Sequence, residues 1–248
     1  MGTDDRDGPK AKKKRQERKE ARKRLKNGRG SETKETLERV LIVTEGTKTE
    51  PLYFDKLIEH LKLVTTDIKV TGKSASCPLK VVEYAIELYE ETKNTKDEYD
   101  LVFCVIDKDS HDKYEDALLY AKKYIPKNIL STINSIPCFE LWLLLHYTYT
   151  SKPFQKRGEK SKGGKSICET LIKDELKKYL PNYEKNISNL SDDELSYIFN
   201  DDTIQVTIKR AEQLLTHCES CVTDNPSTKV HQLVVKLQEI KKRPIKDS

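Results

Sequence analysis

The sequence predicts an α/β fold, in which a mostly parallel sheet is flanked by helices and followed by a C-terminal helical appendage. Residues 40–44 and 101–106 are continuous apolar runs rich in β-branched side chains. Such runs are typical of strands that are covered on both faces of a parallel sheet. Strand and helix patterns alternate as far as about residue 147, which favours a wound sheet.

The expected elements follow from local signals in chain order. Strands are expected at residues 40–44, 67–71, 101–106 and 129–136. Helices are expected from Thr49, from Pro78, at Tyr114–Tyr124 and after Pro137. Pro51 and Pro78 support two of these starts, because proline is tolerated in the first turn of a helix.

The chain divides into three parts. Residues 1–36 form a basic tail that we expect to be disordered, and residues 37–150 form the α/β core. Residues 151–248 begin with a mobile basic loop and continue as the helical appendage. Its helices are expected at 167–180, 203–218 and 226–242, and the last is started by Asn225 as cap and Pro226.

The positive charge is concentrated in the tail. The whole chain has a formal net charge of +5, whereas residues 1–34 hold 14 Lys and Arg against 6 Asp and Glu. The remaining residues are therefore net negative. A segment as polar as the tail cannot bury enough apolar surface to fold alone. It either binds nucleic-acid phosphates without sequence preference or only keeps the protein soluble.

A membrane protein and a zinc framework are not expected. The sequence has no window that approaches the roughly 18 apolar residues of a membrane span. The six cysteines are scattered, without the spacing of a zinc site. We expect reduced thiols in a cytoplasmic protein, with Cys218 and Cys221 packed at a helix end.

Acidic residues directly follow both apolar runs. Asp107 and Asp109 come after residues 101–106, and Glu45 comes after residues 40–44. In open α/β sheets, ligands collect outside the carboxyl ends of the strands. Close carboxylates repel one another, and a hard divalent cation that prefers oxygen ligands relieves this repulsion. We therefore expect Glu45, Asp107 and Asp109 to form a Mg²⁺ site, with Mn²⁺ as the alternative ion.

Other polar residues adjoin this edge. The helix that follows Glu45 and Gly46 presents backbone N–H groups to which a phosphate can bind, with Lys48 beside them. Glu50 is more simply explained as complementing the helix dipole. Glu140 begins a strongly apolar helix, where it either complements the dipole or faces the other acids. We favour the second interpretation, because a charge in so apolar a segment needs a partner.

Together these motifs resemble the RloB family, which is related to AbiLii-like abortive-infection proteins, and more widely the Toprim superfamily. The resemblance is carried by LIVTEGTKTEPLYF (Leu41–Phe54), VIDKDSH (Val105–His111), IPCFELWLLLHY (Ile136–Tyr147) and NPSTKVHQLV (Asn225–Val234). Their order and spacing make the match specific, whereas Asp-x-Asp alone occurs in many unrelated enzymes. The resemblance implies a Toprim-like fold for residues 37–150.

The resemblance also implies roles for single residues. Glu45 matches the strand-end glutamate of Toprim proteins, which acts as general acid/base or metal ligand. Asp107 and Asp109 match their Mg²⁺-binding aspartates, and Glu140 falls in the family's Pro-x-Phe-Glu segment.

Lys108 and His111 depart from the commonest Toprim pattern. We regard Lys108 and Lys48 as candidates for contact with phosphate, and His111 as a candidate for phosphate contact or for protonating a leaving group.

Toprim proteins cleave or transfer phosphodiester bonds, and those of bacterial defence systems act as nucleases partnered with an ATPase. The resemblance therefore implies a Mg²⁺-dependent nuclease of an antiviral abortive-infection system. RNA such as tRNA is the favoured substrate, and a partner ABC- or AAA-type ATPase is expected to control the activity. A homodimer is left open.

Two alternatives belong to other functional classes. The same scaffold can act as a non-catalytic module that binds nucleic acid and docks on the ATPase. A phosphatase of the haloacid dehalogenase type also carries its nucleophilic Asp in Asp-x-Asp after an apolar strand. The pair here follows the third predicted strand and not the first, which disfavours the phosphatase.

Overall fold

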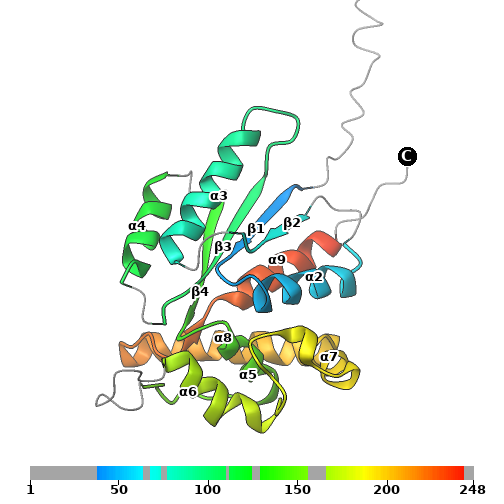
Figure 1. Cartoon of the computed structure of the whole chain (residues 1–248), viewed down its shortest axis with the longest axis vertical. Helices are drawn as coiled ribbons and strands as arrows, with labels where there is room; N and C mark the ends of the chain where they lie inside the picture. Colours follow the sequence, from blue (N-terminus) through cyan, green and yellow to red (C-terminus); the bar gives the residue numbers. More distant parts are fainter. Residues whose placement is uncertain are drawn as a thin grey trace, which may run out of the picture. The chain divides into compact units, whose positions relative to one another are not determined.

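The computed structural model describes residues 38–63, 68–73, 77–109, 112–124, 129–155 and 166–242. The basic tail, His111 and residues 156–165 of the basic loop lie outside these ranges. The described residues form a five-stranded sheet in the order β2–β1–β3–β4–β5 with helices on both faces (Figure 1). The predicted α/β class, with a mostly parallel sheet and a C-terminal helical part, is confirmed.

The sheet contains all four predicted strands. They are β1 (Val40–Thr44), β2 (Ile68–Thr71), β3 (Leu101–Asp107) and β4 (Leu130–Ile136). The strand β1 lies between β2 and β3, and β3 pairs in turn with β4, always in parallel. A short strand, β5 (Ser227–Thr228), pairs antiparallel with the end of β4.

The helices of the α/β core also follow the prediction. They are α2 (Thr49–His60), α3 (Pro78–Thr92), α4 (Tyr114–Tyr124) and α5 (Glu140–Tyr147). The appendage contributes α6 (Ile167–Asp174), α7 (Asp192–Ile198), α8 (Asp201–Cys221) and α9 (Val230–Lys242), with short 3₁₀ turns η1 (Leu176–Lys178) and η2 (Ile187–Asn189). None of the helices among the described residues is long and apolar enough to cross a membrane.

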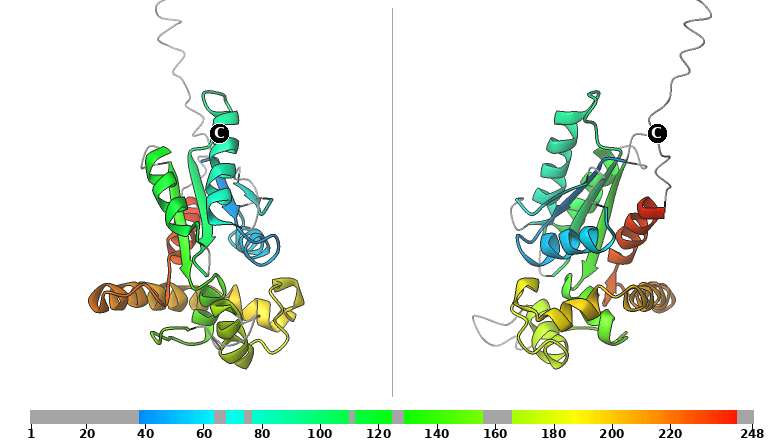
Figure 2. Two further views of the ribbon diagram at one scale, coloured as in Figure 1. Left: turned by 60° about the vertical axis from the view of Figure 1, so that its left-hand side comes forward. Right: turned by 90° about the vertical axis from the view of Figure 1, so that its right-hand side faces the viewer.

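Helices cover both faces of the sheet, which explains the continuous apolar runs. In β1, Val40 and Ile42 enter one hydrophobic cluster together with side chains of α2 and α5. The alternate residues Leu41 and Val43 enter a second cluster with α3 and α4. Figure 2 shows α3 and α4 on one side of the sheet and α2 and α9 on the other. Because both sides are buried, the strand needs apolar residues at every position.

The appendage shares a hydrophobic core with the α/β part. Leu171 of α6 and Leu214 of α8 belong to the same cluster of buried side chains as Trp142 of α5 and Phe54 of α2. The packing of α5 against α6 and α8 therefore depends on apolar burial, the main favourable term in folding. The division of the chain at residue 150 stays a prediction.

The expected helix start at Asn225 and Pro226 is wrong. These residues are joined by a cis peptide bond, β5 follows, and α9 begins only at Val230. The Asn225 side chain binds the backbone of Phe154, accepting from its N–H at 3.2 Å and donating to its carbonyl at 2.7 Å. Ser227 and Thr228 pair with β4 and therefore stay extended. Asn225 does not cap a helix, because its side chain binds the segment at Phe154 instead.

The single helix expected at residues 167–180 is interrupted. The helix α6 ends at Asp174, Glu175 leaves the helical conformation, and η1 follows. The break lets Leu176, Leu180 and Tyr183 all reach the buried core.

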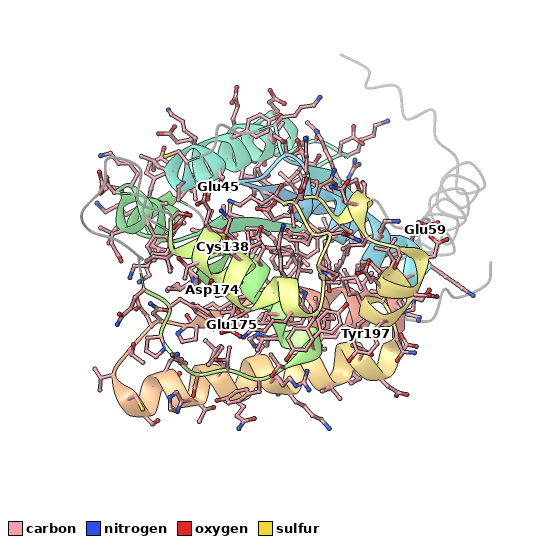
Figure 3. All side chains as sticks on the ribbon, turned by 60° about the horizontal axis from the view of Figure 1, so that its bottom comes forward. Glu45, Glu59, Cys138, Asp174, Glu175 and Tyr197 are labelled. Carbon is pink, nitrogen blue, oxygen red and sulfur yellow. A yellow bond between two sulfur atoms is a disulfide. The ribbon has the colours of Figure 1, made fainter. Side chains whose placement is uncertain are left out.

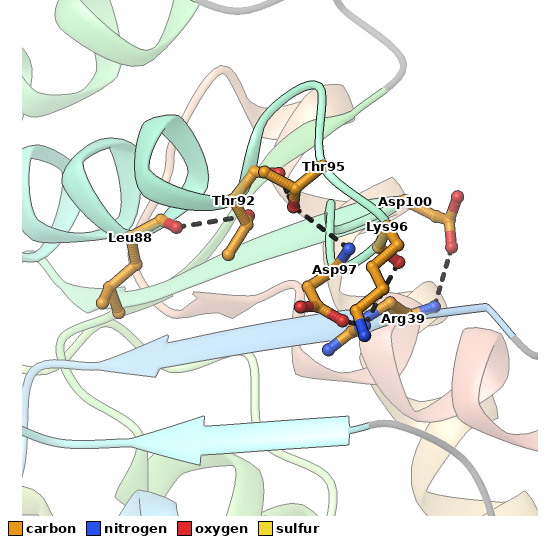
Figure 4. A network of polar contacts seen from close by, with 7 residues as sticks. All are labelled: Arg39, Leu88, Thr92, Thr95, Lys96, Asp97 and Asp100. Carbon is orange, nitrogen blue, oxygen red and sulfur yellow. Dashed lines mark hydrogen bonds and ion pairs between the residues drawn. The ribbon is translucent and has the colours of Figure 1, made fainter.

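A polar network joins the amino-terminal ends of β1 and β3 (Figure 4). The backbone N–H of Arg39 donates to Asp100 at 2.8 Å, and its guanidinium pairs with Asp97 at 2.7 Å. Thr95 orders this turn by accepting a hydrogen bond from the Asp97 N–H at 3.1 Å. Glu45 and Asp107 lie at the opposite, carboxyl-terminal ends of these two strands.

Gly72 lets the end of β2 approach the loop between β1 and α2. A Cβ atom at this position would lie 2.2 Å from the carbonyl oxygen of Gly46 and 3.0 Å from Cα of Thr47. Both are backbone atoms, so neither neighbour can move aside as a flexible side chain would.

We expect Gly72→Ala to lower the free energy of unfolding by about 1–3 kcal/mol, because the added methyl group overpacks this contact. Urea unfolding followed by circular dichroism measures the change. Lys73→Ala, at the exposed neighbouring position, is the matched control and should change stability by less than about 0.5 kcal/mol. Equal stability of the two variants would contradict the contact.

Candidate active site

Glu45 and Asp107 meet at the carboxyl ends of two neighbouring strands. Glu45 follows the last residue of β1, and its N–H extends the sheet by donating to the carbonyl of Val105 at 3.1 Å. Asp107 ends β3, and its N–H donates to Oε2 of Glu45 at 3.2 Å. The parallel pairing of β1 with β3 thus brings together the two acids that the sequence placed at one edge.

Asp109 is held at the same edge by backbone contacts with the end of β4. The N–H of Lys108 donates to the carbonyl of Ser135 at 2.9 Å, and the N–H of Asp109 donates to the carbonyl of Pro137 at 2.8 Å. The Oδ1 atoms of Asp107 and Asp109 are both buried, with no hydrogen-bond partner in the described part of the chain. Buried carboxylate oxygens normally have partners, so these two atoms are open to a ligand.

Glu50 joins these acids, although its place on α2 favoured a helix-dipole role. Its side chain is buried and turns back, so that Oε1 accepts from the N–H of Gly46 at 3.2 Å. A Cβ at Gly46 would lie 2.0 Å from Oε2 of Glu50, so the absence of a side chain makes room for the carboxylate. In the sequence, the four-residue spacing from Gly46 to Glu50 was the signal that could have indicated this contact.

Glu140 begins α5 and is buried among groups from the appendage. Its Oε1 accepts from the hydroxyl of Tyr183 at 3.0 Å, and its Oε2 lies 3.2 Å from Sγ of Cys168. Tyr183 also contacts Thr49 at the start of α2, with 3.1 Å between the two hydroxyl oxygens. No local pattern in the sequence indicated Tyr183, Cys168 and Thr49 as neighbours of the site.

We call Glu45, Glu50, Asp107, Asp109 and Glu140 the acidic centre. Burial, followed by the charges of Glu50, Glu140 and Glu45, raises the pKa of Asp107 well above its usual value. Burial and the charge of Glu140 raise the pKa of Glu50 to about 7. The charge of Glu140 acts on both Glu50 and Asp107, as expected if Glu140 faces the other acids. Desolvation and mutual repulsion together oppose the ionised state of the whole group.

The pKa of Glu140 reflects opposing influences. Burial raises it, and the ammonium group of Lys185 is the largest influence that lowers it. The hydrogen bond from Tyr183 lowers it further, while the charge of Asp109 raises it. Glu140 therefore lies within electrostatic reach of both the acids and a lysine of the appendage.

A disulfide joins Cys138, in the loop before α5, to Cys168 of α6 (Figure 3). The expectation of reduced thiols is wrong for this pair, which comes together only when the appendage folds against α5. Among the described residues, Cys138, Glu140 and Cys168 are the one group of three such side chains with ligand atoms within 4.8 Å of one another, but the two sulfur atoms are bonded to each other and offer no thiolate to a metal ion. Cys77, Cys104, Cys218 and Cys221 remain free thiols.

The predicted cationic residues differ in their placement. Lys48 precedes α2 and is exposed. Lys108 forms an ion pair with Asp224 and lies over the Tyr114 ring, 5.6 Å from its centroid. We predicted that Gly46 contributes to phosphate binding, but its N–H donates a hydrogen bond to Oε1 of Glu50. His111 lies outside the described residues, so its predicted role stays a prediction.

The acidic centre suits a hard divalent cation. Carboxylate oxygens are the ligands that Mg²⁺ and Mn²⁺ prefer, and a cation would relieve the repulsion that raises these pKa values. The ligand atoms of Glu45, Asp107 and Asp109 do not all lie within 4.8 Å of one another, unlike those of the group that contains Cys138 and Cys168. The Oδ1 atoms of Asp107 and Asp109, without a hydrogen-bond partner in the described part of the chain, are carboxylate oxygens that an ion could bind without displacing a hydrogen bond.

A protein-family model described as RloB-like protein matches residues 40–237 of the chain. This range contains all five members of the acidic centre and most of the appendage. No curated protein and no solved structure matches the sequence.

In the absence of divalent metal, we expect stability to fall as the pH rises from about 5 to 8. The folded state holds the Glu50 proton up to a pKa of about 7, against a usual value of 4.5, so it binds more protons than the unfolded chain in this window. The loss should be on the order of 3 kcal/mol. Urea unfolding in EDTA measures it.

Glu50→Gln should flatten this pH dependence, because the amide carries no charge and still offers an oxygen to Gly46. Glu59→Gln, on the exposed side of the same helix, is the control and should keep the wild-type profile. Added Mg²⁺ should restore stability near pH 8. A wild-type profile that stays flat in EDTA would contradict the acidic centre as described.

Proposed function

The chain belongs to the RloB-like protein family, and from that premise we propose that it is a Mg²⁺-dependent nuclease of the Toprim type. One observation carries the proposal: at the carboxyl end of the sheet, where the Asp107 N–H donates to Glu45, the buried Oδ1 atoms of Asp107 and Asp109 have no hydrogen-bond partner in the described part of the chain. This arrangement favours a cation-assisted reaction, because such a cluster of carboxylates is costly to bury without an opposite charge.

Glu45, Asp107 and Asp109 are the residues that would hold the ion. A bound Mg²⁺ supplies charge neutralisation at the scissile phosphate and lowers the pKa of a water molecule. Glu45 positions or deprotonates the attacking nucleophile, for which its place beside the Asp107 backbone is suited. Glu50, with its pKa raised to about 7, is a group able to hold and release a proton near neutral pH, and burial raises the pKa of Glu140 as well.

Substrate and partner rest on the family resemblance. We propose RNA, tRNA included, as the substrate, and an ABC- or AAA-type ATPase as the partner that controls cleavage in an abortive-infection response. The match over residues 40–237 argues against the haloacid dehalogenase alternative, because it ties the Asp-x-Asp motif to another family.

We expect the double substitution Asp107→Asn and Asp109→Asn to reduce cleavage by at least about 100-fold, because the ion loses its two best ligands. Wild-type cleavage should be abolished by EDTA and restored by Mg²⁺ or Mn²⁺. RNA sequencing of cells that express each protein identifies the substrate, and purified protein with that RNA gives the rate.

Asp193→Asn, at an exposed position in the first turn of α7, is the matched control and should leave cleavage unchanged. Undiminished cleavage by the double variant would refute the proposal. Binding of RNA or DNA by the wild type, without turnover and without need for Mg²⁺, would favour the non-catalytic docking module.

A further inference from the structure

The appendage reaches the acidic centre through the segment Tyr183–Lys185, which lies between η1 and η2. Tyr183 is completely buried, and its hydroxyl donates to Oε1 of Glu140 at 3.0 Å. Since that hydroxyl has one proton, the hydroxyl of Thr49 is the donor in the 3.1 Å contact with Tyr183. Tyr183 thus links the first residues of α2 and α5, two helices that begin at the carboxyl end of the sheet.

Lys185 has an unusual backbone conformation two residues later. Its φ of 52° lies in the left-handed region, which a side chain other than glycine or asparagine adopts at a cost of roughly 1–2 kcal/mol. Tyr183 on one side and Ile187 on the other are fully buried and anchor the segment. Strained residues of this kind persist where the surroundings impose them, and they cluster at ligand sites.

Lys185 is also the cation with the clearest relation to the acids. Its side chain is exposed, yet its charge lowers the pKa of Glu140. Lys108, by contrast, pairs with Asp224. Lys108, one of the two lysines that the sequence singled out, is therefore occupied, whereas Lys185 lies two residues from Tyr183 and within electrostatic reach of Glu140.

An acidic centre repels a polyanion unless cations offset its charge. A lysine ammonium binds phosphate as a compact point charge with three donors. We propose that the segment Tyr183–Lys185 completes the site: Tyr183 is a positioning residue that holds the Glu140 carboxylate, and Lys185 binds a phosphate oxygen of the nucleic-acid substrate. This inference rests on the proposed nuclease function and names the part of the appendage that contacts the substrate.

The test of Lys185 measures binding apart from cleavage. Fluorescence anisotropy with a labelled single-stranded RNA, in Ca²⁺ in place of Mg²⁺, gives the affinity of each variant over a range of salt concentrations. Lys185→Ala should weaken binding roughly tenfold and reduce the slope of log affinity against log salt by about 0.7, as expected for one lost phosphate contact. Lys185→Arg should retain most of the affinity.

Lys173→Ala, at an exposed position on α6, is the matched control and should leave the affinity and the salt slope unchanged. An unchanged affinity and slope for Lys185→Ala, or an equal loss for Lys173→Ala, would overturn the role of Lys185.

The test of Tyr183 uses a variant that keeps the ring. Tyr183→Phe should lower kcat about tenfold with little change in KM, because Glu140 loses its orienting hydrogen bond while the RNA contact remains. Tyr179→Phe, at an exposed tyrosine of the appendage, is the control and should behave as wild type. A Tyr183→Phe variant with wild-type kcat would overturn the positioning role.

Failure of the nuclease proposal would be visible separately. If the wild type cleaves neither RNA nor DNA, the proposed function fails and with it the kcat test of Tyr183. The anisotropy measurement still decides whether Lys185 contacts phosphate.

Discussion

The burial of like charges at the carboxyl ends of β1 and β3 is the constraint on which the rest of the structure depends. Desolvation and mutual repulsion raise the pKa values of Asp107, Glu50 and Glu140. Backbone groups hold the cluster in place: the N–H of Asp107 binds Glu45, and the N–H of Gly46 binds Glu50. Parallel strand pairing sets the positions of these donors, so the acids cannot simply move apart.

The appendage contacts this cluster at Glu140. It shares a hydrophobic core with α2 and α5, and from that core Tyr183 reaches Glu140. The disulfide between Cys138 and Cys168 joins the same two regions immediately beside the Glu140 carboxylate. Apolar burial, a covalent link and a hydrogen bond thus act on one short stretch, the loop that enters α5.

The distribution of charge follows from this arrangement. The chain without its first 34 residues is net negative, and five carboxylates are concentrated at one edge. Any phosphate ligand therefore has to be attracted by particular cations and not by the general field of the folded part. Under the proposed function, a divalent ion and Lys185 supply this attraction at the site.

The sequence by itself determined the sheet and the meeting of Glu45 with Asp107. Continuous β-branched runs encode strands buried on both faces, and parallel strands end at the same edge, so acids that follow them must converge. Local patterns failed where a distant partner decides the outcome. Asn225 and Pro226 carry the signals of a helix start, but pairing of the next two residues with β4 keeps them extended.

Only the tertiary structure decided which groups surround the acids. Tyr183 lies 43 residues from Glu140 and 134 residues from Thr49 in sequence, and Cys168 lies 30 residues from Cys138. No periodicity or spacing encodes such contacts, because they depend on how the appendage packs its apolar side chains against α2 and α5. The positions of the strands follow from local chemistry, whereas the partners of a buried carboxylate follow from the packing of the whole chain.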